Sequence, residues 1–408
     1  MTEPVQPAPP PTPNWLPGSV LATCFLFALV GRGTGETFSV FLLPLQQAFG
    51  WDRAQVTGIY GISALAIGFA GPVAGYLIDH LGPRWLYVVG AAALFAAYAG
   101  AAYATELWHF YLALGICIGF ASACLGNVAQ TPLIAIWFKG RVSTVLGIIG
   151  GATGIGALIF APMAQVLIDL YGYRTAYGVL AGVALLLVVP LVFLPWTRIE
   201  AGRDGTGPGP AATGWSIRRA VTEPVIWAMF AVYFLTSTAI SVIQPQMVAY
   251  LVEVGFSSLT AATAVGFAGL SASVGMVIFG WLADRIGRRL TLSLSYLSTA
   301  IGLGVLALMA VWPSPVLLVL YVMTFGLSLG SRGPLIASLA QRIYAGSTLG
   351  RVLGFLVIGM GTGTAFGAWI GGTLHDYFGG YQANFVVAWA SIALALTPWW
   401  VSPRLRRL

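Results

Sequence analysis

The sequence predicts an all-α integral membrane protein in which twelve transmembrane helices form two pseudo-symmetric six-helix halves. Three observations lead to this prediction: an extreme apolar composition, a regular succession of long apolar runs, and an internal repeat. Of the 408 residues, 58% are hydrophobic and only 8% are charged, whereas soluble domains carry about 25% charged residues. Lipid rather than water must therefore be the solvent for most of the chain.

The shape of the apolar runs excludes the other membrane architecture and a soluble enzyme. Strands of a membrane barrel are segments of about ten residues with alternating polarity. Here the stretches 181–193 and 316–323 are continuously apolar, as in spanning helices, which need about 20 apolar residues. A helical membrane protein is the class that remains.

Breaks at Gly, Pro and charged residues divide the chain into twelve expected spans. We expect a disordered Pro-rich tail (1–17), an N-terminal six-helix half (18–196), a cytoplasmic linker (197–223), a C-terminal six-helix half (224–403) and a basic tail (404–408). The tail has no basic n-region of a signal peptide. The expected spans are 18–48, 54–78, 85–104, 107–137, 142–169, 175–195, 225–252, 258–283, 290–312, 315–342, 350–375 and 383–402.

The basic residues predict the orientation of these spans, because short cytoplasmic loops retain Lys and Arg. With both termini in the cytoplasm, only Arg53 and Arg174 lie outside and only Arg32 and Arg332 lie within spans. The net charge of +7 then reflects topology and needs no nucleic-acid partner. All other basic residues are inside: Arg84, Lys139, Arg141, Arg198, Arg203, Arg218, Arg219, Arg285, Arg288, Arg289, Arg342, Arg351, Arg404, Arg406 and Arg407.

Cysteine and histidine positions predict neither a disulfide framework nor a metal centre. Cys24, Cys117 and Cys124 all fall inside apolar segments, and their odd number cannot close into a full set of bridges. The three histidines, His80, His109 and His375, are far from one another and from the cysteines in sequence. We therefore expect no metal and no cofactor.

An internal repeat relates the two expected halves. The segment 75–84, GYLIDHLGPR, recurs at 280–289 as GWLADRIGRR, with Gly, Leu, Asp, Gly and Arg in register. Shorter matches follow: PLIA at 132–135 and 334–337, VLG at 145–147 and 352–354, and Asp169 with Gly172 and Tyr173, which match Asp376 with Gly380 and Tyr381. Duplicated halves with a substrate site between them are typical of secondary transporters.

On these residues the chain resembles the major facilitator superfamily over residues 18–402. The G-x-x-x-D-x-x-G-x-R loop motif of that family is present twice, fully in the second copy, whereas His80 and Pro83 replace basic residues in the first. Glycine permits close helix approach, and an aspartate at a helix end accepts hydrogen bonds from a neighbouring helix N-terminus and from arginines. We interpret the motif as a gate; ordinary topology charges in tight turns are the alternative. The gating set is Gly75, Asp79, Gly82, Arg84, Gly280, Asp284, Arg285, Gly287, Arg288 and Arg289, together with Arg141.

A second resemblance points to a subfamily. The segment 137–141, WFKGR, followed by Gly147, Gly151 and Gly154, is similar to the start of the fifth helix in monocarboxylate and oxalate/formate-type porters. It has one Arg where the monocarboxylate form has two, and the acidic-glycine-aromatic run of their first helix is missing. Elements typical of drug/proton antiporters and sugar porters are missing as well, which favours organic anions.

Charged residues inside the membrane mark a pathway for substrate or ions by default. Arg32 lies 14 residues beyond Gly18, or about 21 Å along the first helix, and Glu36 follows one turn later on the same face. They form either a structural ion pair or part of a cavity wall, with Glu36 as proton acceptor.

Arg332 has no acidic residue on its own helix, and the repeat places it where Gln130 stands in the other half. In the family that the chain resembles, helices one, four, seven and ten line the central cavity. We therefore expect a substrate site formed by Arg332, Arg32, Asn127, Gln130 and Gln244, with Arg332 binding a carboxylate through its planar fork. The alternatives for Arg332 are helix carbonyls or a pair with Glu36.

Taken together, the sequence predicts a secondary active transporter, not an enzyme, that carries a small organic anion, with a monocarboxylate favoured. We expect coupling to a proton through Glu36, alternating access around a midplane site, and a monomer in a bacterial inner membrane. The partners are the substrate, the proton and the lipid bilayer, and no nucleic acid. Alternatives are an exporter of a drug-like or zwitterionic compound and, less favoured, a membrane sensor without transport.

Overall fold

The computed structural model describes residues 15–138, 141–200, 223–343 and 349–401, and every regular element in these ranges is a helix. Most of the expected tail, most of the expected linker and the whole C-terminal tail lie outside the described residues. The last two residues of the expected N-terminal tail, Leu16 and Pro17, are the first residues of α1. The N-terminal group consists of α1 (Leu16–Gly31), η1 (Thr34–Thr37), α2 (Phe38–Phe49), α3 (Arg53–Tyr103), α4 (Leu107–Phe110), η2 (Tyr111–Cys117), α5 (Ile118–Leu125), α6 (Asn127–Trp137), α7 (Val142–Ala184), η3 (Leu185–Leu187), α8 (Val188–Phe193) and α9 (Trp196–Glu200).

The C-terminal group begins at residue 224 and is built in the same way. It consists of α11 (Pro224–Ser241), η5 (Gln244–Gln246), α12 (Met247–Glu253), α13 (Ser258–Ile286), α14 (Arg288–Met309), α15 (Pro315–Tyr321), η6 (Val322–Gly326), α16 (Leu327–Leu329), α17 (Arg332–Ile343), α18 (Leu349–Phe378) and α19 (Gln382–Val401). Each of the twelve spans expected from the sequence overlaps one of these helices.

Ten helical segments of the described chain are long and apolar enough to cross a membrane. Two of them, Arg53–Tyr103 with 51 residues and Thr144–Phe193 with 50, far exceed the roughly 20 residues of one crossing. Each contains one non-helical glycine, Gly82 with φ 82° and Gly172 with φ 81°. Only glycine adopts this conformation without steric cost, so the chain changes direction at both positions.

The distribution of side chains is that of a protein in lipid. Large apolar side chains such as Leu170, Val192 and Val277 are more than 60% exposed on the helix perimeter. Polar side chains such as Gln130 and Asn384 are buried instead, where they bond to helix carbonyls. Lipid cannot satisfy polar groups, so they are placed between helices.

Backbone irregularities recur in the two groups and give the internal repeat a structural basis. Positive φ occurs at Gly50 and Gly255, at Gly82 and Gly287, and at Gly172 and Gly379. The last pair has the 207-residue offset of Asp169 and Asp376, so Gly379 rather than Gly380 is the structural counterpart of Gly172. The 3₁₀ breaks η1 and η5 and the π-helical turns η2 and η6 also match.

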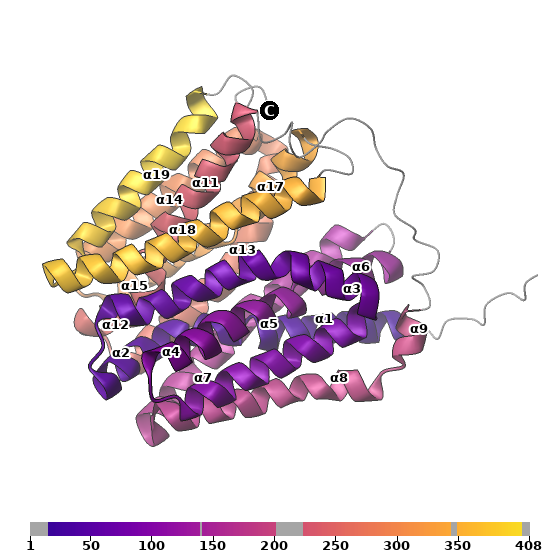
Figure 1. Ribbon diagram of the computed structural model, residues 1–408. Coiled ribbons are helices and arrows are strands. Elements are labelled where there is room, and N and C mark those ends of the chain that lie inside the picture. The colour runs from indigo at the N-terminus through magenta and orange to yellow at the C-terminus, as the bar shows by residue number, and fades with distance from the viewer. Residues whose placement is uncertain (1–14, 139–140, 201–222, 344–348, 402–408) are drawn as a thin grey trace, which may run out of the picture.

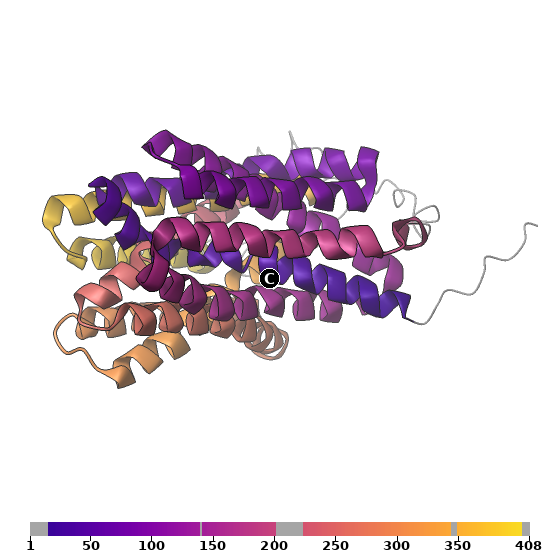
Figure 2. The ribbon, with the colours of Figure 1, turned by 90° about the horizontal axis from the view of Figure 1, so that it is seen from below.

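The two groups lie side by side, with α1–α9 in the lower part of Figure 1 and α11–α19 in the upper part. Seen from below in Figure 2, most long helices of both groups run in roughly one direction. The largest contacts between the groups are made by α3 with α18 and by α7 with α13. We call these two contacts the seams.

Glycine clearances show that the α3/α18 seam loosens along its length. A Cβ on Gly372 would lie 2.6 Å from Ala54 Cα, and one on Gly361 would lie 2.9 Å from Ala64 O. Further along, a Cβ on Gly68 would find its nearest atom at 3.8 Å, and one on Gly71 would meet nothing within 4 Å. The helices touch where α3 begins and separate toward Gly82.

The α7/α13 seam loosens in the same direction. A Cβ on Gly154 would lie 2.5 Å from Ser273 Oγ, one on Gly150 would lie 3.9 Å from the sulfur of Met276, and one on Gly147 would meet nothing within 4 Å. We call the end with the turns at Gly50, Gly172, Gly255 and Gly379 the closed end. The end with the turns at Gly82 and Gly287 is the open end.

Candidate functional site

The first membrane helix is interrupted near its centre, between α1 and α2. Glycines 31, 33 and 35 lower the helix propensity of this stretch. Gly33 also lies so close to α7 that a Cβ on it would be 2.6 Å from Gly156 Cα. The break, η1, therefore follows Gly31 and Gly33 and contains Gly35, and both charged residues of the first span lie next to it or in it.

Arg32 and Glu36 are not in ion-pair contact, although the Arg32 charge acts on the Glu36 carboxylate. Arg32 is exposed and Glu36 is partly buried. Among the described residues, no ion pair and no side-chain hydrogen bond involves the guanidinium of Arg32. Its donors thus remain available for a ligand in this conformation.

Glu36 contacts the C-terminal group through Gln244, one of the expected site residues. The Gln244 Nε2 donates a hydrogen bond of 3.4 Å to Glu36 Oε2. These residues belong to η1 and η5, the repeat-related breaks of the first helix in each group. The two breaks therefore meet, and a carboxylate stands at their junction.

Asn127 and Gln130 have different surroundings. Gln130 is 2% exposed, and its Nε2 donates a hydrogen bond of 3.0 Å to the carbonyl of Leu125. That carbonyl lies at the C-terminal end of α5, where the chain breaks at Gly126, so the glutamine satisfies a carbonyl freed by the break. Asn127, the first residue of α6, is exposed.

Arg332 points toward α14. Its side chain is 2% exposed. The Nε donates to Ser295 Oγ at 3.1 Å, and Nη2 donates to Ser295 O at 3.0 Å and to Thr299 Oγ1. The guanidinium carbon lies 4.5 Å from the ring centre of Tyr296.

The Arg332 charge has no acidic partner among the described residues, and its Nη1 has no hydrogen-bond partner there. Of the alternatives that the sequence left open, the bond to Ser295 O is a helix carbonyl contact, although it lies within α14 rather than at a helix end. The structure does not bring Arg332 to the other expected site residues. Glu36 and Gln244 are the pair that it joins.

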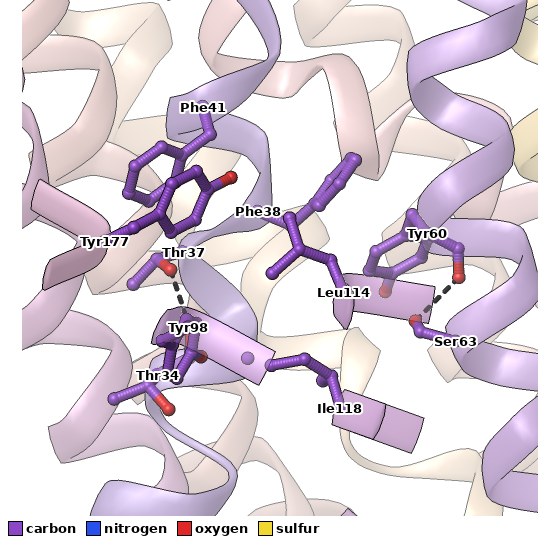
Figure 3. A pocket seen from close by; sticks show the side chains of 11 residues that line it. Thr34, Thr37, Phe38, Phe41, Tyr60, Ser63, Tyr98, Leu114, Ile118 and Tyr177 are labelled. Carbon is purple, nitrogen blue, oxygen red and sulfur yellow. Dashed lines mark hydrogen bonds between the residues drawn. The ribbon is translucent and has the colours of Figure 1, made fainter. Parts of the chain in front are cut away.

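A cavity lies beside the η1 break, within the N-terminal group (Figure 3). It contains about 320 Å³ of empty space including its mouth. No charged side chain of the described chain lines it. Five of its lining residues are aromatic and come from α2, α3 and α7: Phe38, Phe41, Tyr60, Tyr98 and Tyr177.

The closed end carries a cluster of polar contacts that the sequence analysis did not identify as a site. Asp376, at the end of α18, accepts hydrogen bonds from the backbone N–H groups of Arg53 at 3.0 Å and Ala54 at 2.8 Å. These are the first two amides of α3, which have no partner within their own helix. The Asp376 carboxylate thus caps a helix of the other group.

The Arg53 side chain continues this cluster. It is 4% exposed, and its Nη2 lies 2.8 Å from Glu253 Oε1. Its Nη1 donates to the hydroxyl of Tyr381, which in turn donates to Glu253 Oε1 at 3.3 Å. Burial raises the pKa of the Tyr381 hydroxyl, so it remains a neutral donor. We call Arg53, Glu253, Asp376 and Tyr381 the latch.

Two features of the sequence could have pointed to the latch. Arg53 is one of only two basic residues expected on its side of the membrane, and Asp376 was recognised only as the repeat partner of Asp169. Their meeting depends on the packing of α3 against α18.

Comparison with known proteins identifies the family. The model of the Major Facilitator Superfamily matches residues 21–347 and again residues 229–407. The chain belongs to the Major Facilitator Superfamily.

Named relatives of this Major Facilitator Superfamily protein are transporters. Monocarboxylate transporter 13 of Bos taurus is 30% identical over 386 residues, which are 94% of this chain and 88% of that protein. The MFS-type transporter YcxA of Bacillus subtilis is 23% identical over 387 residues, 92% of each chain. The protein is thus an integral membrane transporter, and not an enzyme.

Solved structures confirm the fold of this superfamily member. The nucleoside transporter NupG aligns with a TM-score of 0.74 at 15% identity and covers 94% of this chain and 98% of its own. A D-xylose-proton symporter aligns with a TM-score of 0.70 at 17% identity, covering 94% and 97%. The all-helical fold predicted from sequence is the one observed.

The two copies of the loop motif lie at the open end. Gly82 and Gly287 take positive φ, and Asp79 and Asp284 are exposed. Within the described ranges no hydrogen bond or ion pair involves the Asp284 side chain. Arg84 donates to Leu191 O and Arg288 to Ser338 Oγ, and Arg285 and Arg289 lie over the rings of Trp281 and Trp400.

The remaining members of the gating set make few contacts. A Cβ on Gly75 or on Gly280 would meet nothing within 4 Å, so neither glycine is held against another helix here. Arg141 is exposed at the start of α7. The contacts given above for the motif residues therefore join no helix of one group to a helix of the other within the described chain.

Proposed function

We propose that the protein is a secondary active transporter of a small organic anion, with a monocarboxylate as the favoured class and Arg32 as its anchor. The observation that carries the proposal is the exposed guanidinium of Arg32 at the break in the first helix, which is unpaired among the described residues. A charge near the membrane centre is costly and is retained for function. A planar guanidinium binds a carboxylate through two parallel hydrogen bonds.

Arg32 replaces Arg332 as the proposed anchor because the two arginines differ in what they already bind. Arg332 donates from Nε and Nη2 to α14, whereas no guanidinium donor of Arg32 is engaged by the described part of the chain. The names of the relatives support the substrate class, since several are called monocarboxylate transporters.

The presence of one arginine and one acid in the same site gives a simple basis for proton coupling. With Glu36 ionised, Arg32 and Glu36 sum to zero charge; with Glu36 protonated, the site has one positive charge and matches a monoanion. Anion and proton would then favour each other's binding, since such coupling is reciprocal. The hydrogen bond from Gln244 to Glu36 Oε2 couples this change of charge to the C-terminal group.

Alternating access requires the closed end and the open end of the protein to open in turn. In our proposal, twelve crossings form two six-helix halves, 18–196 and 224–403, which rock about the Arg32 site while the latch and the gate motifs close in alternation. Both termini and the 197–223 linker face the cytoplasm, and the protein is a monomer in a bacterial inner membrane. The closed end is then external. In intact cells, a membrane-impermeant thiol reagent should label a cysteine at position 105 but not one at 210; labelling at 210 contradicts this orientation.

The anchor is tested by uptake of radiolabelled propionate into proteoliposomes. Arg32→Gln should abolish uptake and binding, and Arg32→Lys should weaken binding about tenfold or more, because a lysine lacks the bidentate fork. Arg174→Gln, a change of an exposed arginine in the same group, is the matched control and should transport normally. Unchanged propionate affinity in folded Arg32→Gln protein would remove Arg32 from the site.

Coupling is tested with Glu36→Gln. This variant should still exchange propionate across the membrane at equal pH but should lose accumulation driven by a proton gradient, because its site stays positively charged. Gradient-driven accumulation at the wild-type level would show that the proton binds elsewhere.

One observation favours a second candidate, transport of a zwitterion. Since Arg32 and Glu36 are not paired with each other, they offer one partner to a carboxylate and one to an ammonium group. Binding of alanine that exceeds binding of propionate, and that Glu36→Gln abolishes, would favour this candidate over the organic anion.

A further inference from the structure

The cavity beside η1 contains a buried hydroxyl group that lacks a partner. Tyr177 is 1% exposed, and its hydroxyl has no hydrogen bond within the described part of the chain. The hydroxyl of Tyr98, which is 2% exposed, lies beside the Thr34 side chain. Both side chains line the cavity, and Figure 3 shows Tyr177 reaching from α7 toward Phe38. A buried polar group without a partner is costly, so a ligand that offers one is stabilised there.

The walls of the cavity favour a flat apolar body. Tyr177 is stacked on Phe41 with ring centres 3.9 Å apart, and the ring centre of Tyr98 lies 6.3 Å from that of Tyr177. Phe38 and Tyr60 form a further ring pair at 5.5 Å. Aromatic rings prefer such offset or tilted neighbours, and a charged group would find no counter-ion among the lining residues.

The position of the cavity links it to the anchor. Gly35 lines the cavity and lies three residues from Arg32, which is about 6 Å along a 3₁₀ segment. A Cβ on Gly35 would meet nothing within 4 Å, so the space beside it is open. A carboxylate at Arg32 and a ring in the cavity are thus within the reach of one small molecule.

We propose that this cavity is a subsite for the ring of an aromatic carboxylate whose ring carries a hydrogen-bonding substituent such as a hydroxyl group. The inference rests on the proposed function, because it assigns the carboxylate to Arg32. The empty space of about 320 Å³ includes the open mouth of the cavity, so the cavity suits a single ring rather than a larger body.

Four probes distinguish binding in the cavity from binding at Arg32: 4-hydroxyphenylacetate, phenylacetate, propionate and 4-methylphenol. Their binding to the purified full-length protein is measured by thermal shift and titration calorimetry. We expect 4-hydroxyphenylacetate to bind about tenfold more tightly than phenylacetate, and phenylacetate at least tenfold more tightly than propionate. The neutral 4-methylphenol tests the cavity without the anchor.

Gly35→Val places a side chain in the cavity and should remove the preference for ring compounds while propionate binds as before. Gly178→Val is the matched control, since a Cβ on Gly178 also meets nothing within 4 Å but the residue does not line the cavity. Tyr177→Phe should reduce the advantage of 4-hydroxyphenylacetate over phenylacetate.

The outcomes distinguish the two proposals. If Gly35→Val binds phenylacetate as tightly as the wild type, or if no ring compound binds the wild type, the subsite is overturned even where Arg32→Gln abolishes propionate binding. If Arg32→Gln leaves acid binding unchanged while Gly35→Val abolishes 4-methylphenol binding, the subsite stands and the anion anchor falls.

Discussion

The latch should control how often the closed end opens, and Asp376→Asn is the sharpest perturbation of it. The Asp376 carboxylate accepts bonds of 3.0 and 2.8 Å from the first two amides of α3. An asparagine keeps one accepting oxygen but loses the negative charge, and with it the second bond and the attraction to the helix N-terminus. The residue is exposed, so we take a cost near the value for a lost helix cap, about 1–2 kcal/mol.

The lost bonds destabilise only the conformation in which the closed end is shut. The two bonds join the N-terminal and C-terminal groups, so they exist only while the closed end is shut. A loss of about 1–2 kcal/mol therefore raises the ratio of open to shut molecules roughly 5- to 30-fold. Stability of either group by itself is unaffected, since the contact is between them.

The assay is pulsed electron paramagnetic resonance between spin labels at positions 105 and 311, which are exposed at the closed end, one in each group. Asp376→Asn should increase the long-distance population by the factor above. The matched control is Asp169→Asn, because Asp169 is the repeat counterpart and bonds to Gln165 within its own helix at 2.8 Å. Equal distance distributions in Asp376→Asn and the wild type, or an equal shift in the control, would refute the reasoning.

Three further predictions follow from buried charge, backbone conformation and the gate. Arg332→Met should keep or raise the melting temperature, because replacing a buried charge without a counter-ion by an apolar side chain of similar volume is often neutral or stabilising; loss of propionate binding in this variant would return Arg332 to the site. Gly82→Ala and Gly287→Ala should each destabilise the protein by about 1–2 kcal/mol in thermal unfolding because of their positive φ, whereas Gly178→Ala should change little, and equal melting temperatures for all three would contradict the assigned strain. Asp284→Asn should leave thermal stability and propionate binding unchanged but slow transport, since the Asp284 carboxylate is unpaired among the described residues and is expected to act when the open end closes. Asp79→Asn should slow transport less. A loss of propionate affinity in Asp284→Asn equal to its loss of transport would place Asp284 in the fold or the site.

The sequence was sufficient to predict the membrane class and the helices. Hydropathy is a local property of about 20 consecutive residues, so the spans could be placed without any tertiary contact. The repeat was equally visible, because duplicated segments keep their turn glycines, as Gly82 and Gly287 show by sharing the same backbone conformation.

The roles of the charged residues could not be predicted in this way. Arg32 and Arg332 are both arginines in the middle of apolar runs. In the sequence they look alike, and they differ in what surrounds the side chain in the fold. One is exposed, while the other binds Ser295 and Thr299 of α14. The direction of a side chain depends on helix rotation and packing, which a single sequence does not encode locally.

The contacts of the latch also depend on tertiary packing. An aspartate that accepts bonds from the N-terminus of a neighbouring helix was expected at Asp79 and Asp284, and the structure also contains such a contact at Asp376. The chemistry of a carboxylate at a helix N-terminus follows from the residue type alone. Which aspartate meets which helix was decided by the tertiary structure, because the contact joins residues more than 300 positions apart that only the packing of α3 against α18 brings within hydrogen-bonding distance.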